Sequence, residues 1–465
     1  MMEKHKIAFI EFICPTTRSS YLENYGLHCL AAIAKQDGHD VNVFQLVDIE
    51  SAKRVLDYSP DVLAFSSMAW QYDSSLKIAE FIKNQNPHIK IIFGGSHTSS
   101  YPQGLEDALR KKIIDYGIVG EADLSFRELL SGLNNPRKTL EGLVFIDDGL
   151  LKINPKGIRI KNLDDLPFAY RDPEILSRTK IRTIMNPPPS QQINTATTAY
   201  SRGCPFNCTF CSSRDIWGRN VVWRSAKNVV DEIEELKEKY RTNTLFFTDL
   251  SFNSNQGKVK ELCNELIKRK VDIKWLALAR VATPDGVNAL IDEDLLRTMY
   301  EAGCRKLGYG LESVIPEFQE NFKKKIDSEM MIDIIEKGHK MGILHKGYMV
   351  MGHPGESKET IKKTLSMLRK IRFDEIKITF LTPFPGSEFY RQQKSIGNLI
   401  TEDFSRYSTD EPVLKCHNLS HSELIRIREN LYKEYYRSQE YASLVAEKTK
   451  RFPELEKSYE EMHSF

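Results

Sequence analysis

The 465-residue sequence has little that would place it in a membrane, in a secretory pathway or on a nucleic acid. No apolar run approaches the ~18 residues that a membrane-spanning helix needs. Lysine and arginine number 66 against 64 acidic residues, so no charge excess indicates nucleic acid or an anionic membrane surface. The first residues lead directly into an apolar, strand-like segment. We therefore expect no signal peptide, and we expect the protein to be cytoplasmic.

Cysteine is also scarce, with eight in the chain, and five of them are scattered: Cys14, Cys29, Cys263, Cys304 and Cys416. These five lie mostly in apolar patterns. In a reducing compartment we interpret them as small buried side chains rather than as disulfides. An auxiliary ligand or a reactive thiol is the alternative role for each.

The other three cysteines lie close together. Cys204, Cys208 and Cys211 have the spacing C-x3-C-x2-C and directly follow an apolar, strand-like run. Clustered thiolates are soft ligands that suit iron–sulfur clusters or zinc. Zinc usually takes a fourth cysteine or histidine at short spacing, and none follows nearby in the sequence. A cluster held by three cysteines leaves one iron open to a small molecule. A zinc knuckle or buried structural thiols are the alternatives.

The N-terminal part predicts a doubly wound, Rossmann-like α/β fold. Short apolar runs over residues 7–13, 41–46, 62–65, 89–93 and 116–119 are separated by amphipathic segments. Strands that alternate with helices of 10–15 residues form βαβ units and a parallel sheet. Ligands of such sheets bind at the carboxyl ends of the strands. Small residues that let a ligand approach the backbone follow two of these runs: Ser66, Ser67, Gly94 and Gly95.

From Thr198 the alternation restarts at longer spacing, with candidate strands over residues 198–201, 244–248, 274–278, 306–309, 348–351 and 375–381. Six strand–helix units fit a partial (β/α)6 barrel of the TIM type, whose chemistry lies at the carboxyl ends of the strands. Asp249, Arg280 and Glu312 follow the second, third and fourth strands. A salt bridge that caps a barrel strand is the structural alternative for each of them.

We divide the chain into a first domain over residues 1–135, a connector over 136–193, a barrel over 194–400 and a helical region over 401–465. The connector begins with a predicted hairpin over residues 142–153 and ends near three consecutive prolines at 187–189. In the helical region, Leu424, Ile427, Leu431 and Tyr435 form an apolar stripe of the kind that is usually core. The charged segment beyond Lys448 predicts a solvated helix.

The cysteine loop, with Phe210 just before its last cysteine, resembles the cluster loop of the radical S-adenosylmethionine (SAM) enzymes. In that family three cysteines hold a [4Fe–4S] cluster, and the amino and carboxylate groups of SAM chelate the fourth iron. The resemblance continues along the barrel, with G-x-E-S at Gly310–Ser313 and G-x-P-G-E at Gly352–Glu356. It implies that the SAM-binding residues are Phe210, Asp249, Arg280 and Glu312, since carboxylates suit an ammonium group and a guanidinium suits a carboxylate.

The N-terminal part resembles the cobalamin-binding domain fused to many radical SAM enzymes. Ser66–Met68 matches its serine loop, Gly94–His97 its glycine pair and Gly120-Glu121 its closing motif. The resemblance implies that cobalamin lies against Ser66, Ser67, Gly94 and Gly95. The loop over residues 14–21 lacks the histidine of the D-x-H-x-x-G motif. Cobalamin then binds without a protein base, or the domain serves as a scaffold or substrate module. His97 either touches the nucleotide tail of cobalamin or satisfies a loop carbonyl.

Together these resemblances imply a cobalamin-dependent radical SAM enzyme. The cluster, reduced by a one-electron donor such as flavodoxin or ferredoxin, would cleave SAM to a 5′-deoxyadenosyl radical that abstracts hydrogen from an unactivated carbon. Methylcobalamin would then supply the methyl group. We expect a small-molecule or biosynthetic-intermediate substrate and no nucleic-acid partner. A cyclase, ring-contraction or rearrangement enzyme, with or without cobalamin, is the nearest alternative. A zinc- or cluster-bearing binding protein without turnover is the other, and the polar residues at the strand ends argue against it.

Overall fold

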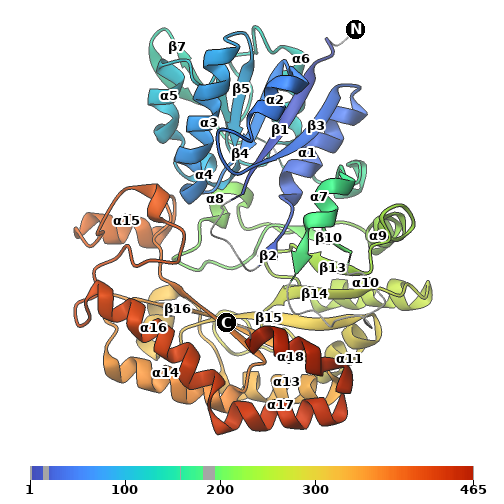
Figure 1. Ribbon diagram of the computed structural model, residues 1–465, viewed down its shortest axis with the longest axis vertical. Helices are drawn as coiled ribbons and strands as arrows, with labels where there is room; N and C mark the ends of the chain where they lie inside the picture. The colour runs from blue at the N-terminus through green and yellow to red at the C-terminus, as the bar shows by residue number, and fades with distance from the viewer. Residues whose placement is uncertain (1–2, 14–19, 158, 182–193, 464–465) are drawn as a thin grey trace.

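The computed structural model describes residues 3–13, 20–157, 159–181 and 194–463. It has two α/β parts, one stacked on the other, with the C-terminal helices along the second part (Figure 1). Two features of the sequence lie outside the described residues. One is most of the loop that lacks the cobalamin histidine, including Cys14, and the other is the triple proline at 187–189.

The first part is built on a seven-stranded sheet of order β3-β1-β4-β5-β6-β7-β8. Its first five members in that order pair in parallel: β3 (Asp40–Leu46), β1 (Lys6–Phe12), β4 (Val62–Ser66), β5 (Lys90–Gly94) and β6 (Tyr116–Ile118). One face packs on α1 (Tyr25–Gln36) and α6 (Asp123–Ser131). The other packs on α2 (Lys53–Tyr58), α3 (Tyr72–Gln85) and α5 (Glu106–Arg110). Burial on both faces explains why these strands are continuous apolar runs, and the predicted doubly wound fold is confirmed.

The predicted hairpin extends this sheet. It consists of β7 (Leu143–Asp147) and β8 (Leu150–Ile153), and β7 pairs antiparallel with β6. Asp148 and Gly149 join the two strands with φ of 48° and 74°. Two successive positive φ angles give a turn whose twist matches that of the flanking strands. The first sheet therefore continues past residue 135, to Ile153.

The second part is an open six-stranded parallel barrel of order β10-β13-β14-β15-β16-β17. The strands are β10 (Thr195–Thr198), β13 (Thr244–Phe247), β14 (Lys274–Ala279), β15 (Cys304–Glu312), β16 (Leu344–Met351) and β17 (Glu375–Phe380). Their outer faces pack on α9 (Ala226–Tyr240), α10 (Gln256–Lys268), α11 (Glu293–Glu301), α13 (Ser328–Met341) and α14 (Lys358–Ile371). The partial barrel is confirmed. Its first strand ends three residues earlier than predicted.

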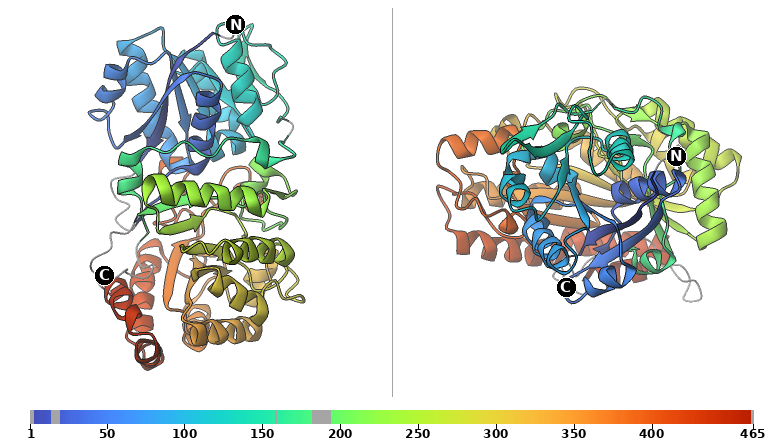
Figure 2. Two further views of the ribbon diagram at one scale, coloured as in Figure 1. Left: turned by 90° about the vertical axis from the view of Figure 1, so that its right-hand side faces the viewer. Right: turned by 90° about the horizontal axis from the view of Figure 1, so that it is seen from above.

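Shorter elements join the two parts. β2 (Ser20–Tyr21) pairs with β9 (Lys180–Ile181), and β11 (Ser201–Arg202) pairs with β12 (Val222–Trp223). Helix α9, on the outer face of the barrel, lies directly beneath the first part (Figure 2). The remaining short helices are α4 (Gly95–Ser100), α7 (Pro173–Arg178), α8 (Ser213–Trp217), α12 (Pro316–Phe322) and α15 (Glu388–Ser395).

The C-terminal helices cover the free edge and the floor of the barrel. They are α16 (His421–Tyr436), α17 (Gln439–Arg451) and α18 (Glu456–His463). The backbone N–H groups of Ile376 and Ile378 in β17 donate to the hydroxyls of Tyr436 and Tyr432, at 2.9 and 2.7 Å. Backbone N–H groups on the free edge of β17, which no neighbouring strand pairs with, thereby find hydrogen-bond acceptors in side chains.

The segment beyond Lys448 is solvated on one side only: its charged side chains are exposed, whereas Leu455 and Tyr459 are buried. Lys448 is 3% exposed, and its Nζ lies 2.7 Å from Oδ1 of Asp374. The hydroxyl of Tyr459, which is 2% exposed, donates to the same carboxylate. Asp374, at the amino end of β17, is a buried charge that must be paired, and the C-terminal segment supplies its partners.

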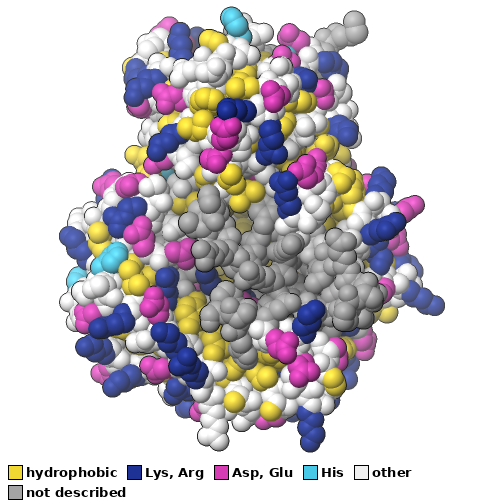
Figure 3. Space-filling model, viewed as in Figure 1, with side chains coloured by type: hydrophobic (Ala, Val, Ile, Leu, Met, Phe, Trp, Pro, Cys, Tyr) yellow, Lys and Arg dark blue, Asp and Glu magenta, His cyan; other side chains and the backbone are white. Residues whose placement is uncertain are grey.

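The surface carries charges of both signs, and over the face shown in Figure 3 basic and acidic side chains are interspersed. Within the described ranges, no helix combines the length and apolarity needed to cross a bilayer.

Candidate active site at the cysteine loop

The three clustered cysteines lie on the loop between β11 and α8, where the barrel faces the first part (Figure 1). Cys204 and Cys208 are partly buried and Cys211 is exposed. Gly203 opens the loop with φ of 106°, and a Cβ there would collide with the carbonyl oxygen of Asn220. Only glycine fits this turn, so backbone geometry fixes the direction in which the loop leaves β11.

The middle of the loop is anchored to the barrel. The backbone N–H of Thr209 donates to the carbonyl of Phe322 at 3.1 Å, and its hydroxyl donates to the carbonyl of Asn321 at 2.7 Å. The Thr209 carbonyl in turn accepts from the N–H of Phe389 at 2.9 Å. The Phe210 ring meets the Phe322 ring edge-on at 5.2 Å. The structure thus places Phe210, a predicted cofactor contact, in the packing between the loop and α12.

Two cations approach Cys208. Burial raises the pKa of the Cys208 thiol, and Lys324 and Arg280 act in the opposite direction. The Arg280 Nη1 lies 3.8 Å from the Cys208 Sγ, and the guanidinium stacks over the Phe206 ring at 4.2 Å. Asn253 holds the Arg280 backbone through both its amide oxygen and its amide nitrogen, at 2.9 and 2.7 Å. The Arg280 Nη2 is buried and has no partner among the described residues, so it can donate to a ligand.

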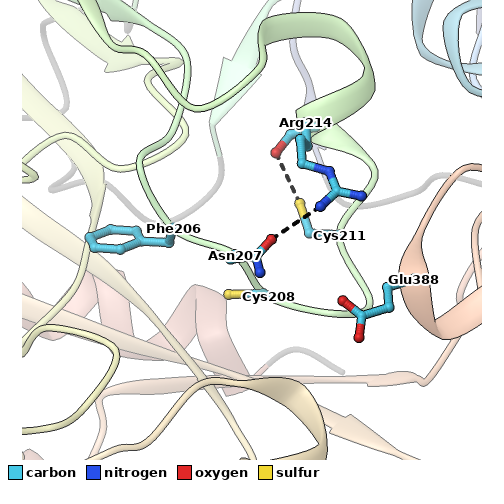
Figure 4. Close-up of a pocket in the computed structure, with 7 residues that line it drawn as sticks. Phe206, Asn207, Cys208, Cys211, Arg214 and Glu388 are labelled. Atoms are coloured by element: carbon cyan, nitrogen blue, oxygen red, sulfur yellow. Dashed lines mark hydrogen bonds between the residues drawn. The ribbon is translucent and has the colours of Figure 1, made fainter.

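The loop's pocket side is shown in Figure 4, where Cys208 and Cys211 lie close to Arg214 and Asn207. Arg214 Nη1 donates to Asn207 Oδ1 at 3.3 Å, and the Cys211 thiol donates to Ser213 Oγ at 3.1 Å. Glu388 lines the same pocket.

Glu312 stands at a bulge. Its φ is 58°, and the register between β15 and β16 shifts there. The bulge turns its carboxylate toward Lys324, whose Nζ lies 2.7 Å from Oε1. A Cβ on Gly310 would lie 2.5 Å from each of these two atoms, so the pair needs a glycine beneath it. A non-glycine residue held at positive φ indicates a functional constraint on the backbone.

Asp249 faces the entry of the loop rather than the open mouth of the barrel. Its Oδ1 accepts from the N–H and the hydroxyl of Ser201, at 2.6 and 2.5 Å, and its Oδ2 accepts from the N–H of Tyr200 at 3.0 Å. The carboxylate is 1% exposed, and burial raises its pKa to about 6. Both oxygens are therefore used by the protein. Because Tyr200 and Ser201 turn toward Asp249, β10 ends before them.

The predicted cobalamin residues line the carboxyl edge of the first sheet. Gly95 has φ of 93°, and a Cβ there would lie 2.7 to 2.9 Å from atoms of Ser66 and Ser67. Buried polar atoms nearby lack a partner among the described residues: Ser67 Oγ, His97 Nδ1 and Thr98 Oγ1. The His97 ring packs on Tyr72 at 4.7 Å, and burial lowers its pKa to about 4. Buried polar atoms without a partner need one, and a polar ligand or a water molecule beside this glycine turn would supply it.

This edge meets the cysteine loop. Helix α4, which begins at Gly95, packs against α8, which follows Cys211. Arg202 at the start of the loop donates to Glu121 at 2.7 Å and to Asp123 at 2.9 Å. The cysteine loop and the predicted cobalamin edge therefore lie next to one another, and the ion pairs of Arg202 with Glu121 and Asp123 join them.

The sequence did not point to several residues of this site. Lys324 is one of three consecutive lysines, and Asn253 and Arg202 have no distinctive spacing of their own. Only their contacts with Glu312, Arg280 and Glu121 reveal them.

The residues fit the implied groups. Three soft thiolates on one loop suit an iron–sulfur cluster, which distributes them over separate irons. Across the ranges that the structure describes, no three His, Cys, Asp or Glu side chains are arranged to hold one metal ion. Arg280 offers an unused donor for a carboxylate, and the unpaired polar atoms around Gly95 suit an amide-rich cofactor such as cobalamin.

Two family profiles match this chain. The radical SAM superfamily profile matches residues 198–368, and the B12 binding domain profile matches residues 16–130.

Curated relatives align along most of the chain. An uncharacterized methyltransferase of Pyrococcus horikoshii is 26% identical over 419 residues, covering 88% of this chain and 87% of the relative. An anaerobic magnesium-protoporphyrin IX monomethyl ester cyclase of Rubrivivax gelatinosus is 26% identical over 422 residues, covering 88% and 72%. The solved structure of the radical SAM methyltransferase TsrM from Kitasatospora setae, with cobalamin and a [4Fe–4S] cluster bound, superposes with a TM-score of 0.69 at 17% identity. It covers 94% of this chain and 86% of its own, which shows a shared fold.

Proposed function

Because this chain joins a B12-binding domain to a radical SAM domain, we propose that it is a cobalamin-dependent radical SAM enzyme that methylates an unactivated carbon. The proposal rests on the position of the cysteine loop beside the carboxyl edge of the first sheet. The cysteine loop, with Arg280 and its unused donor, lies below the sheet edge that carries Ser67 and His97 with unpaired polar atoms. Methyltransferases among the relatives and fold neighbours support the reaction type.

Each group has residues of this chain to hold it. Cys204, Cys208 and Cys211 supply the thiolates for a [4Fe–4S] cluster. When bound, SAM at a reduced cluster supplies a 5′-deoxyadenosyl radical, and methylcobalamin supplies the methyl group. Arg280 would receive the carboxylate of SAM through its Nη2, and Glu312 would receive the ammonium group; the unpartnered Nη2 and the partly buried carboxylate support these roles. Ser66, Ser67, Gly94 and Gly95 would lie against cobalamin.

The chain's own contacts hold the loop in place. Lys324 is ion-paired with Glu312 and lies near Cys208, while the Arg280 guanidinium stacks on the Phe206 ring. Thr209 and Asp249 fix the loop at its middle and its entry.

A cyclase or rearrangement enzyme on the same scaffold is the second candidate, and the cyclase relative favours it. The two candidates differ in whether the methyl group of SAM appears in the product. The same proposal includes a small-molecule substrate, a one-electron donor such as flavodoxin or ferredoxin, no nucleic-acid partner and a cytoplasmic location. The described cysteines are all free, and charges of both signs are mixed on the surface, which supports these assignments.

The test is anaerobic reconstitution with iron and sulfide, followed by reduction in the presence of SAM. The wild-type protein should gain the visible absorbance of an iron–sulfur cluster and release 5′-deoxyadenosine. Cys208→Ala should lose at least a hundredfold in that release, because one iron loses its protein ligand. Cys263→Ala, a buried cysteine on the far side of the barrel wall, should retain it. Equal release by Cys208→Ala and wild type would contradict the radical SAM assignment.

Cobalamin is tested separately by adding hydroxocobalamin and measuring cobalt per chain. Wild type should bind one equivalent in a form without a histidine base. Gly95→Val should lose it, because the new side chain collides with Ser66 and Ser67. Intact release of 5′-deoxyadenosine without cobalamin binding would favour the second candidate.

A further inference from the structure

We propose that Lys324 is a positioning residue of the cluster site: its buried ammonium group, held beside Cys208, raises the reduction potential of the cluster on the cysteine loop. This proposal rests on the proposed function, which places a [4Fe–4S] cluster on Cys204, Cys208 and Cys211. It is carried by the contacts that bring one lysine out of a run of three from the end of α12 to the cysteine loop.

The end of α12 turns one lysine inward and leaves its two neighbours outside. Lys323, the residue after the helix, has φ of 51°, and its backbone N–H still donates to carbonyls of the last helical turn. A residue in this left-handed conformation ends a helix and changes the direction of the chain. Beyond it, Lys324 is 6% exposed, whereas Lys323 and Lys325 are both exposed. A lysine is rarely buried to this extent unless it is paired.

The partner of Lys324 lies at the bulge in β15. The Lys324 Nζ is 2.7 Å from Oε1 of Glu312, whose φ is 58° where the register between β15 and β16 shifts. A Cβ on Gly310 would lie 2.5 Å from each of these two atoms. The bulge and the missing side chain at Gly310 therefore leave room for the ion pair in one position.

The segment before Lys324 is bonded to the cysteine loop at the residue next to Cys208. The carbonyls of Asn321 and Phe322 accept from the hydroxyl and the backbone N–H of Thr209, at 2.7 and 3.1 Å. Burial raises the pKa of the Cys208 thiol, and the charge of Lys324 lowers it. The ammonium group is thus the member of the ion pair that acts on Cys208, and the positive end of the pair lies toward the loop.

A positive charge in this place favours the reduced form of the cluster. Reduction transfers one electron from the donor to the cluster, breaks no bond and adds one negative charge beside the three thiolates. Within one cluster type, nearby charge and hydrogen bonding set the reduction potential. Salt and water screen a buried charge much less than an exposed one, so Lys324 has a stronger effect than its exposed neighbours Lys323 and Lys325.

The competing explanation is that Lys324 only neutralises Glu312. In that case the pair has no effect on the cluster, and both charges can be removed together without changing the potential. An ion pair whose positive end lies toward the loop gives a different result for each member. Removal of the ammonium group lowers the reduction potential, and removal of the carboxylate raises it.

The test measures the midpoint potential of the reconstituted cluster without SAM, by anaerobic titration with dithionite and redox mediators. Electron paramagnetic resonance detects the reduced cluster. At the wild-type midpoint, the ratio of reduced to oxidised cluster in Lys324→Met should be at least tenfold lower, which is ~59 mV for a one-electron couple. Glu312→Gln should shift the potential in the opposite direction. Lys325→Met, which removes an exposed lysine of the same run, should match the wild type.

A double variant keeps the test valid if Lys324→Met, with Glu312 left unpaired, fails to hold a cluster. Lys324→Met combined with Glu312→Gln leaves neither charge without a partner, and its potential should lie below that of the wild type and above that of Lys324→Met. A disordered loop does not produce this pattern, because disorder has no reason to shift the two single variants in opposite directions.

A wild-type potential in both Lys324→Met and the double variant, or a downward shift in Glu312→Gln, would overturn the proposal. Release of 5′-deoxyadenosine by the wild type separates this result from the proposed function. The expected order of potentials without any SAM cleavage counts against the proposed function alone. Unchanged potentials with normal SAM cleavage count against the role of Lys324 alone, and a wild-type protein that assembles no cluster overturns both.

Discussion

Asp249 shows how one buried carboxylate can determine the position of a catalytic loop. It accepts from two backbone N–H groups and one hydroxyl at the point where β10 leaves the sheet and the cysteine loop begins. These bonds turn the chain upward toward the first domain. A carboxylate that satisfies two consecutive N–H groups cannot be replaced without leaving buried donors unpaired.

Asp249→Asn is expected to destabilise the protein by about 2–3 kcal/mol, because an amide N–H₂ would face the N–H of Tyr200 or Ser201. Iron per chain after reconstitution should fall with it. Ser201→Ala removes only the hydroxyl bond and should cost about 1 kcal/mol. Urea unfolding and iron analysis of both variants check this order.

A direct contact between Asp249 and SAM predicts a different result. If Asp249→Asn keeps wild-type stability and iron content but raises the dissociation constant for SAM, then Asp249 contacts SAM, as the sequence analysis predicts.

At the scale of elements, the open barrel has an edge strand that its own helices protect. Tyr432 and Tyr436, one turn apart on α16, each accept from an N–H of β17, and the same hydroxyls lie 3.3 and 3.5 Å from the carbonyls of Ile378 and Ile376. Their spacing on the helix matches the two-residue repeat of hydrogen-bonding groups along one edge of a strand. The C-terminal helices thus take the place of a seventh strand.

Replacing both residues, Tyr432→Phe with Tyr436→Phe, should lower the free energy of unfolding by about 2–3 kcal/mol, roughly the sum of two hydrogen-bonding hydroxyls. The aromatic packing is retained, so the loss reports the edge contacts. Tyr300→Phe on α11, which stacks on Arg305 rather than bonding to a strand edge, is the matched control and should change stability little. A double variant as stable as this control would show that water satisfies the edge equally well.

The whole molecule is held together by buried charges between its two parts. Arg171 from the connector is ion-paired to Glu23 of the first part and, at 2.9 Å, to Glu232 on α9. Glu23 also accepts from the N–H and the hydroxyl of Thr197 in β10, at 2.8 and 2.7 Å. All four residues are less than 10% exposed. Breaking such a pair leaves an uncompensated buried charge, which is costly.

Arg171→Met is therefore expected to cost about 3–5 kcal/mol, since two carboxylates lose their partner. Because the contact joins two folding units, the loss should appear as an earlier, separate unfolding step of one part. Arg171→Met combined with Glu23→Gln should recover part of the loss, because it removes one of the orphaned charges. Urea unfolding followed by fluorescence and by far-UV circular dichroism measures both effects. Coincident transitions at the wild-type midpoint would contradict this role.

Local features of the sequence determined the strands of both sheets and the position of the cysteine loop. The eleven predicted parallel strands are found because continuous apolar runs between amphipathic segments are a property of neighbouring residues. The spacing of Cys204, Cys208 and Cys211 likewise indicated a metal site, since the three thiolates lie on one short loop, and the resemblance to the radical SAM enzymes implied the iron–sulfur cluster. The small residues at the ends of β4 and β5 could be recognised for the same reason, and their contact with cobalamin stays a prediction. The domain boundaries at residues 135, 193 and 400 stay predictions.

The tertiary structure alone decided what the partners of these residues are. Asp249 and Glu312 both follow barrel strands, but one bonds to the entry of the cysteine loop and the other to Lys324. The segment beyond Lys448 is charged in sequence, yet it buries Leu455 and Tyr459, and the Tyr459 hydroxyl donates to Asp374. Hydrogen bonds and ion pairs join residues far apart in the chain, and no local pattern encodes which of them will meet.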